Sequence, residues 1–308
     1  MIYWLSCLTR SPPENMIFDE ITLRKLKQLA LVARRVRAGA IKGERRSTHR
    51  GSSVEFADYR NYAPGDDLRR LDWNLYARLE RPFIKLLEEE EDLAVHILVD
   101  ASLSMDWGIG DAHKFHFALR LVAAIGAIAL ACGDHLTIGV LYDQQKPVQY
   151  GPARGQQHLL PLFEFLEAQS PSGKTALVSG LVDFQHTNRR PGLVFLITDL
   201  LTSEDWHAAL LPLLSRGHEI ILFHLLSPDE TEPPLAGDLS LIDCETNLAQ
   251  DISLDSGLRQ LYNQRLIAWR EDVRQICMKK GVRYRFLSTA HPWDQYVLLD
   301  FRQAGIIH

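Results

Sequence analysis

The sequence predicts an α/β fold, in which a doubly wound and mostly parallel sheet follows an N-terminal helical or irregular module. After residue 92, apolar segments of strand length alternate with segments of helical periodicity. The strand-like segments are continuously apolar, as in "LVFLIT" at 193–198, and this is typical of strands buried on both faces of a parallel sheet. With 308 residues, of which 46% are hydrophobic, the chain can fill a substantial core.

The elements of this sheet follow in order from residue 93 onwards. The expected strands span 93–99, 136–142, 193–198, 219–226 and 282–287. The expected helices span 112–131, 157–168, 176–186, 203–215, 256–280 and 293–303. Residues 227–255 contain a Pro-Pro pair and few periodic positions, which predicts a loop or a small hairpin at the sheet edge. His96 and His224 fall within strands, where we expect hydrogen-bonded core residues.

The N-terminal part is expected to divide into a tail, residues 1–16, and a module, residues 17–92, ahead of the α/β domain at 93–308. Residues 17–38 show the apolar spacing of an amphipathic helix, with acidic residues at its start. We therefore interpret the first sixteen residues as a tail or a start-site extension. Residues 55–92 are rich in aromatic residues, Arg and Asp, which predicts an irregular, packed segment, and the acidic run 88–92 predicts a solvated strand entry.

Composition narrows the class of partner and the compartment. The formal net charge is -5 with 24% charged residues, which gives no global attraction to nucleic acid or to a membrane surface. The four cysteines lie far apart without a CxxC pair, which argues against a zinc ribbon or a disulfide scaffold and favours the cytoplasm. The longest apolar stretch, 121–132, is shorter than the about 20 residues that span a bilayer. We interpret it as a core helix and expect neither a membrane span nor nucleic-acid binding.

Oxygen-bearing side chains gather where the predicted strands end. Asp100 ends the first strand and is followed by Ser102 and Ser104, and Asp199 follows the strand "VFLIT". Thr175 lies in a loop that enters a helix. Because the carboxyl ends of parallel strands share one edge of the sheet, these five side chains are expected to converge. Such hard oxygen donors suit Mg²⁺, with Mn²⁺ as an alternative, and an ion held largely by hydroxyls stays positive enough to attract a partner's carboxylate.

This pattern, DxSxS followed by a loop Thr and a strand-end Asp, resembles the metal-ion-dependent adhesion site of von Willebrand factor A domains, whose fold is of the Rossmann type. From about Gly43 onwards the chain is similar to the family numbered fifty-eight among the domains of unknown function, which is encoded beside MoxR-type AAA+ ATPases. The matching segments are "EFADYRNYAPGDDLRRLDW", "LVDASLSM", "GPARG" and "LITDL".

The resemblance implies that Asp100, Ser102, Ser104, Thr175 and Asp199 ligate the metal directly or through water. It also implies a protein-binding module and not an enzyme. Such a module would work with the MoxR-type ATPase in chaperone-like assembly or maturation, on an unknown client that supplies an acidic residue. Many members of this family carry transmembrane helices ahead of this region, and no such helix is expected here. A further departure is Lys174 beside Thr175, since an ammonium group there would weaken cation binding unless it points away.

Three other interpretations of the same residues stay open. Residues 168–175, "AQSPSGKT", fit a relaxed phosphate loop, with Asp199 as its magnesium-binding residue in a nucleotide hydrolase. Helical character before this loop and the missing N–H of Pro171 argue against that function. A phosphoryl transferase with Asp100 as nucleophile would usually carry a second acid where Ser102 stands. Lastly, DxSxS can be a strand-end turn whose side chains bond the local backbone.

Overall fold

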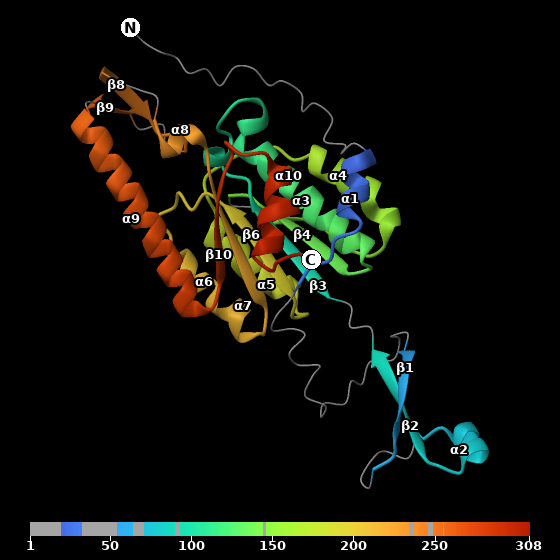
Figure 1. Ribbon diagram of the computed structural model, residues 1–308. Coiled ribbons are helices and arrows are strands. Elements are labelled where there is room, and N and C mark those ends of the chain that lie inside the picture. Colours follow the sequence, from blue (N-terminus) through green and yellow to red (C-terminus); the bar gives the residue numbers. More distant parts are fainter. Residues whose placement is uncertain are drawn as a thin grey trace. The chain divides into compact units, whose positions relative to one another are not determined.

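The computed structural model describes residues 20–32, 54–63, 71–89, 93–143, 146–233, 237–245, 249–254 and 256–308. The predicted tail, residues 1–16, lies outside these ranges. The chain divides into two units, of which one comprises residues 1–41 and 93–308 and the other residues 42–92 (Figure 1).

The smaller unit contains two strands and a short helix. Strand β1 (Val54–Asn61) pairs antiparallel with β2 (Phe83–Glu89), and helix α2 (Trp73–Leu79) lies between them in sequence. The carboxylate of Asp72 caps α2 by accepting two backbone N–H groups of its first turn, at 2.9 and 3.1 Å. In its described residues, 55–63 and 71–89, the segment that the sequence predicted to be irregular therefore contains two strands and a helix. The first two residues of the acidic run 88–92 belong to β2 and are not a strand entry.

The larger unit is built on a six-stranded sheet with the order β10-β7-β6-β3-β4-β5. All neighbouring pairs are parallel except β4 and β5, which are antiparallel. The strands are β3 (Ala94–Asp100), β4 (His135–Leu141), β5 (Val148–Ala153), β6 (Leu193–Thr198), β7 (Glu219–Leu226) and β10 (Arg283–Ser288). This confirms the predicted mostly parallel sheet. Strand β5 is not among the predicted strands, and its side chains are mostly exposed at the sheet edge.

Helices cover both faces of this sheet (Figure 1). One face packs against α1 (Glu20–Leu26), α3 (Lys114–Ala131), α4 (Leu159–Glu167), α10 (Trp293–Gln295) and α11 (Phe301–Gln303). The other packs against α5 (Leu177–Thr187), α6 (Trp206–Ala209), α7 (Leu211–Ser215) and α9 (Ser256–Lys280). The strand order places β3 inside the sheet, with later strands added on both sides of it. The carboxyl end of β3 therefore lies in the middle of the row formed by the carboxyl ends of the parallel strands. Ligands of such sheets bind at that position.

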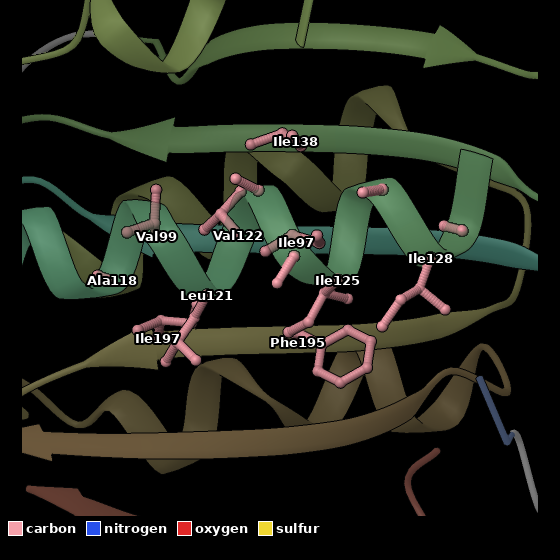
Figure 2. Packing of buried hydrophobic residues seen from close by; sticks show 14 of the residues in the cluster. Ile97, Val99, Ala118, Leu121, Val122, Ile125, Ile128, Ile138, Phe195 and Ile197 are labelled. Carbon is pink, nitrogen blue, oxygen red and sulfur yellow. The ribbon is translucent and has the colours of Figure 1, made fainter. Parts of the chain in front are cut away.

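Helix α3 is the central helix of the core. Figure 2 shows it lying over β3, with Val122 and Ile125 in the same packed layer as Ile97. Full burial of each such side chain contributes about 1.5–3 kcal/mol to folding. Among the described residues α3 is the one helix long and apolar enough to cross a membrane, and 83% of it is buried inside the protein. The predicted core helix is thereby confirmed.

The helix expected at residues 17–38 ends at Leu26. The chain then runs beside the C-terminus, where the N–H of Ala30 donates to the carbonyl of His308 (3.0 Å) and that of Val32 to Ile306 (2.8 Å). Leu29 and Leu31 are buried in the core of the larger unit. Tertiary pairing thus overrides the helical periodicity, and it groups the described residues 20–32 with residues 93–308, whereas the sequence grouped residues 17–92. Residues 33–38 lie outside the described residues.

Two other segments differ from the expected helices. The segment 203–215 forms α6 and α7 as separate short helices, with Leu210 between them. The segment 293–303 contains a π-helical turn, Tyr296–Asp300, between α10 and α11. The predicted loop or hairpin at 227–255 contains helix α8 (Pro228–Thr231) and an antiparallel hairpin of β8 (Gly237–Ile242) and β9 (Ala249–Leu254).

Candidate metal centre

The two predicted aspartates lie at the same edge of the sheet. Asp100 is the last residue of β3, and Asp199 follows Thr198, the last residue of the neighbouring strand β6. The parallel register pairs Val99 with Ile197, so the two strands end level with each other. Both aspartates are buried, with exposed fractions of 1% for Asp100 and 0% for Asp199.

The carboxylate of Asp100 is held by neutral donors. Its Oδ1 accepts the N–H of Ser102 at 3.0 Å, and its Oδ2 accepts the hydroxyl of Thr198 at 2.8 Å. Burial, together with the negative charge of Asp199, raises the pKa of Asp100 to about 6. Among the described residues, no Lys, Arg or His side chain donates a hydrogen bond to Asp100. This buried carboxylate therefore has no ion-pair partner among the Lys, Arg and His side chains of the described residues.

Ser102 and Ser104 present their hydroxyls together. The backbone of Ser102 is extended and the residues after it form a short 3₁₀ turn, Leu103–Met105, which brings the two side chains to the same side. Their Oγ atoms lie 2.9 Å apart, and both residues are buried. A hydrogen bond accounts for this spacing. The same spacing also suits two neighbouring ligands of an octahedral Mg²⁺, because ligands at about 2.1 Å stand about 3.0 Å apart.

Thr175 belongs to a loop that is fastened to the residues following β3. The N–H of Leu103 donates to the carbonyl of Gly173 at 3.0 Å, and the N–H of Ser172 to that of Ala101 at 2.7 Å. The hydroxyl of Thr175 donates to Glu245 Oε1 at 2.8 Å and not to any of the other four predicted ligands. The structure thus joins Asp100, Ser102 and Ser104 through direct hydrogen bonds, and it attaches Thr175 to them through the loop backbone.

A buried lysine that is not among the predicted site residues, Lys114, is paired with Asp199. The Nζ of Lys114, at the start of α3, donates to Asp199 Oδ2 at 2.7 Å and to Glu230 Oε1 at 2.6 Å. Lys114 is 0% exposed. Burial alone would lower the pKa of Lys114, but the two carboxylates raise it above its usual value. The other oxygen of Asp199, Oδ1, accepts the N–H of Leu201 at 3.1 Å.

Lys174, the lysine beside the predicted ligand Thr175, is exposed. Its neighbour Thr175 is half-buried, so the ammonium group of Lys174 is not enclosed with the hydroxyls. Lys114 carries the signal that would have revealed the buried charge, because it begins α3, a helix whose residues from Leu121 to Ala131 are all apolar. A lysine fixed to such a helix needs a carboxylate partner in the core.

The donor set fits a hard cation better than a soft one. Among the described residues, there is no group of three or more His, Cys, Asp or Glu side chains that could hold a metal ion. A zinc-type site in that part of the chain is therefore not supported. The candidate centre has two buried carboxylates and three hydroxyls, so it depends on donors of the kind that Mg²⁺ accepts. Asp199 shares one oxygen with Lys114, which leaves Asp100 as the more available carboxylate.

The loop 168–175 does not have the surroundings of a phosphate loop. A helix, α4, precedes it, whereas a phosphate loop follows a strand so that its N–H groups point at phosphate. The N–H of Ser172 is bound to a backbone carbonyl, and the N–H of Thr175 donates to Glu245 Oε1 at 3.2 Å. A carboxylate at that position would repel a phosphate group.

Comparison with known proteins places residues 58–272 in a match to the family model described as "Protein of unknown function DUF58". An uncharacterised protein of Mycobacterium bovis is 29% identical over 289 residues, which cover 91% of this chain and 90% of that protein. An uncharacterised protein of Mycobacterium tuberculosis matches with the same identity and coverage. Among solved structures, the conserved hypothetical protein BatB from Bacteroides thetaiotaomicron is 15% identical, with a TM-score of 0.43, covering 68% of this chain and 98% of that one.

Proposed function

This chain belongs to the family of proteins of unknown function DUF58, and we propose that it is a cation-dependent protein-binding module. In this proposal, Asp100, Ser102, Ser104, Thr175 and Asp199 hold Mg²⁺, or Mn²⁺ in its place, as in a metal-ion-dependent adhesion site. The α/β domain would then be of the von Willebrand factor A type. The observation that carries the proposal is the buried carboxylate of Asp100, which has no ion-pair partner among the described residues and is followed by two hydroxyls that converge.

The charge of the site favours binding over catalysis. Hydroxyl ligands contribute no negative charge, and Lys114 already offsets part of the charge of Asp199. A divalent ion held in this way keeps positive character, and it attracts a carboxylate from another protein. The proposed partners, a MoxR-type AAA+ ATPase and an acidic client, rest on the family resemblance, and the proposed cytoplasmic location rests on the dispersed cysteines. The proposal assigns the module no catalytic residue.

Binding to the ATPase tests this function. The full chain is immobilised, and a MoxR-type ATPase is passed over the surface with Mg²⁺ and then with EDTA. We expect binding that requires the cation and that is lost in S102A, which removes one hydroxyl ligand. The control variant S215A changes a serine on α7 whose hydroxyl bonds only the carbonyl of Pro212. Binding that is equal in Mg²⁺ and EDTA, or unchanged in S102A, would contradict the proposal.

A further inference from the structure

We propose that strand β10 and the hollow beside it bind an extended peptide that carries a carboxylate side chain. β10 is the outermost strand of the six-stranded sheet, whereas the candidate cation site follows β3 in the interior of the sheet. The peptide site is therefore separate from the proposed cation site. It goes beyond the proposed function and requires no cation.

The backbone of β10 is open on the side away from β7. The N–H of Thr289 donates to a carbonyl of β7 at 3.1 Å, whereas the N–H and C=O of Ser288 bond the hydroxyl of Tyr296 at 3.0 and 3.2 Å. Because alternate residues of a strand bond opposite neighbours, Tyr284 and Phe286 face the same way as Ser288. Among the described residues, their N–H and C=O groups form no hydrogen bond. These groups can therefore pair with an added strand.

A hollow of about 210 Å³ lies between β10 and α9, which are neighbours in the larger unit (Figure 1). The hollow is lined by four residues of α9 on one helical stripe and by one residue of β10, namely Ile267, Arg270, Glu271, Arg274 and Tyr284. Tyr284 thus contributes its backbone to the open edge and its side chain to the hollow. A peptide paired with β10 directs alternate side chains to the same face, and so into the hollow.

Arg270 brings an unbalanced positive charge to the hollow. Its guanidinium carbon lies 3.3 Å from the centre of the Phe286 ring, so the ring covers one face of the planar group. The Nε of Arg270 has no hydrogen-bond partner among the described residues, and no carboxylate there forms an ion pair with Arg270. Stacking fixes the plane of the guanidinium group and leaves the N–H donors on its edge for a carboxylate.

The acidic residue of the hollow does not supply that carboxylate. Glu271 accepts two hydrogen bonds from Arg274, both at 2.7 Å, and a third from Gln275 at 2.7 Å. The charges of Glu271 and Arg274 therefore offset each other, and the lining residues keep the single positive charge of Arg270. One carboxylate matches that charge, and Ile267 offers an apolar wall to the methylene groups of an acidic side chain.

A second copy of the chain fits this edge less well than an acidic peptide. Arg285 is exposed on β10, between the two residues whose backbone is open. Two copies joined edge to edge through β10 would bring these arginines close together, and like charges on paired strands are destabilising. A charged side chain on an edge strand also discourages self-association. The charges of this edge therefore favour an acidic partner.

Binding of alternating peptides tests the site. The probe is a capped peptide of three Thr-Glu repeats, which presents its carboxylates on one face when extended, and the Thr-Gln peptide is its uncharged match. In calorimetry with EDTA, we expect the original chain to bind the Thr-Glu peptide at least about tenfold more tightly than the Thr-Gln peptide. R270Q should lose this preference, and R270K should keep part of it, because Lys retains the charge without the planar fork.

The control variant R265Q removes an exposed arginine of α9 that does not line the hollow, and it should bind both peptides as the original chain does. Hydrogen exchange measures the strand pairing. At a saturating concentration of the Thr-Glu peptide, exchange of the amides of Tyr284 and Phe286 should slow by at least about tenfold. Unchanged exchange at both amides, or equal affinity for the two peptides, would overturn the inference.

Other binding sites and occupants give different results. Peptide binding that requires Mg²⁺, or that is lost in S102A, would assign the carboxylate to the proposed cation site and overturn this inference. A dimer of the original chain that dissociates in R270Q would assign the edge to a second copy, with the same consequence. Loss of the cation site leaves the expected binding in EDTA unchanged, so the two proposals can fail independently.

Discussion

The ammonium group of Lys114 lies 2.7 Å from Asp199 Oδ2, in a contact where both side chains are 0% exposed. This pair joins the start of α3 to the end of β6, and Glu230 on α8 extends it at 2.6 Å from Lys114. A buried ion pair is costly to break, because the partner that is left behind keeps its charge away from water. Lys114 therefore connects the fold of this edge to the charge of the candidate site.

Replacement of Lys114 by Met is expected to destabilise the protein by about 3–5 kcal/mol without divalent cations, since it leaves the buried carboxylate of Asp199 and the partly buried carboxylate of Glu230 uncompensated. Mg²⁺ should raise the melting temperature of K114M more than that of the original chain, because the cation meets a more negative site. Thermal unfolding in EDTA and in Mg²⁺ measures both effects. The double variant K114M/E230Q, which also removes one carboxylate, should recover part of the loss. Stability of K114M equal to that of the original chain would disprove the role of the pair.

Thr198 is expected to position Asp100. Its hydroxyl donates to Asp100 Oδ2 and accepts the N–H of Leu200 at 3.1 Å. T198V removes both bonds within a buried site, so it should cost about 1–3 kcal/mol of unfolding free energy. It should also weaken Mg²⁺ binding by about tenfold or more, as the loss of a bond that orients a ligand does. The control T137V changes a buried threonine of β4 that does not bond Asp100. If the two variants bind Mg²⁺ equally, Thr198 has no positioning role.

The sheet could be predicted because its strands carry their own signal. Continuous apolar runs bounded by turn residues are long enough for strands and too short for helices, so β6 and β7 have the predicted bounds. The convergence of Asp100 and Asp199 followed from parallel topology alone. In contrast, helical periodicity could not reveal that the chain leaves α1 at Leu26, because that change depends on pairing with the distant C-terminus.

The charged neighbours of the site could not be predicted from the sequence either, because they too come from distant parts of the chain. Lys114 and Glu230 lie 116 residues apart, and Glu245 lies 70 residues from Thr175. Neither pair follows a spacing that a helix or a strand imposes. Only the packing of α3, α8 and the β8–β9 hairpin at one sheet edge brings these groups together, and no local pattern encodes that packing.

His96 predicts a loss of stability in mild acid. Its ring is buried in β3, and burial, together with the charge of His218, lowers its pKa from 6.5 to about 4. Below pH 6.5 the unfolded chain binds a proton at His96, whereas the folded chain binds this proton only below about pH 4. The free energy of unfolding should therefore fall through this window, by about 2 kcal/mol for this residue at pH 5.

Denaturant unfolding at pH 7 and pH 5 measures the contribution of His96. The variant H96F should lose about 2 kcal/mol less than the original chain between these pH values, because it removes the titrating ring. H291Q, which changes an exposed histidine, serves as the control. An unchanged pH dependence in H96F would show that other groups determine the acid sensitivity.

Asp100 is expected to oppose folding when no cation is bound. Its folded pKa of about 6 lies above the usual 3.8, so its favourable contribution is present below pH 3.8 and is lost as the pH rises through 6. At pH 7 the buried carboxylate then costs about 2–3 kcal/mol. D100N should be at least as stable as the original chain in EDTA at pH 7, as measured by urea unfolding. A strongly destabilised D100N would mean that the charge of Asp100 itself supports the fold.

Calorimetric titration of Mg²⁺ into the full chain and into D100N tests the central claim most directly, because D100N removes one ligand charge while it retains the fold. We predict that the original chain binds one Mg²⁺ and that D100N binds none over the same concentration range. An original chain that binds no Mg²⁺, or a D100N variant that binds it equally well, would contradict the account of this site.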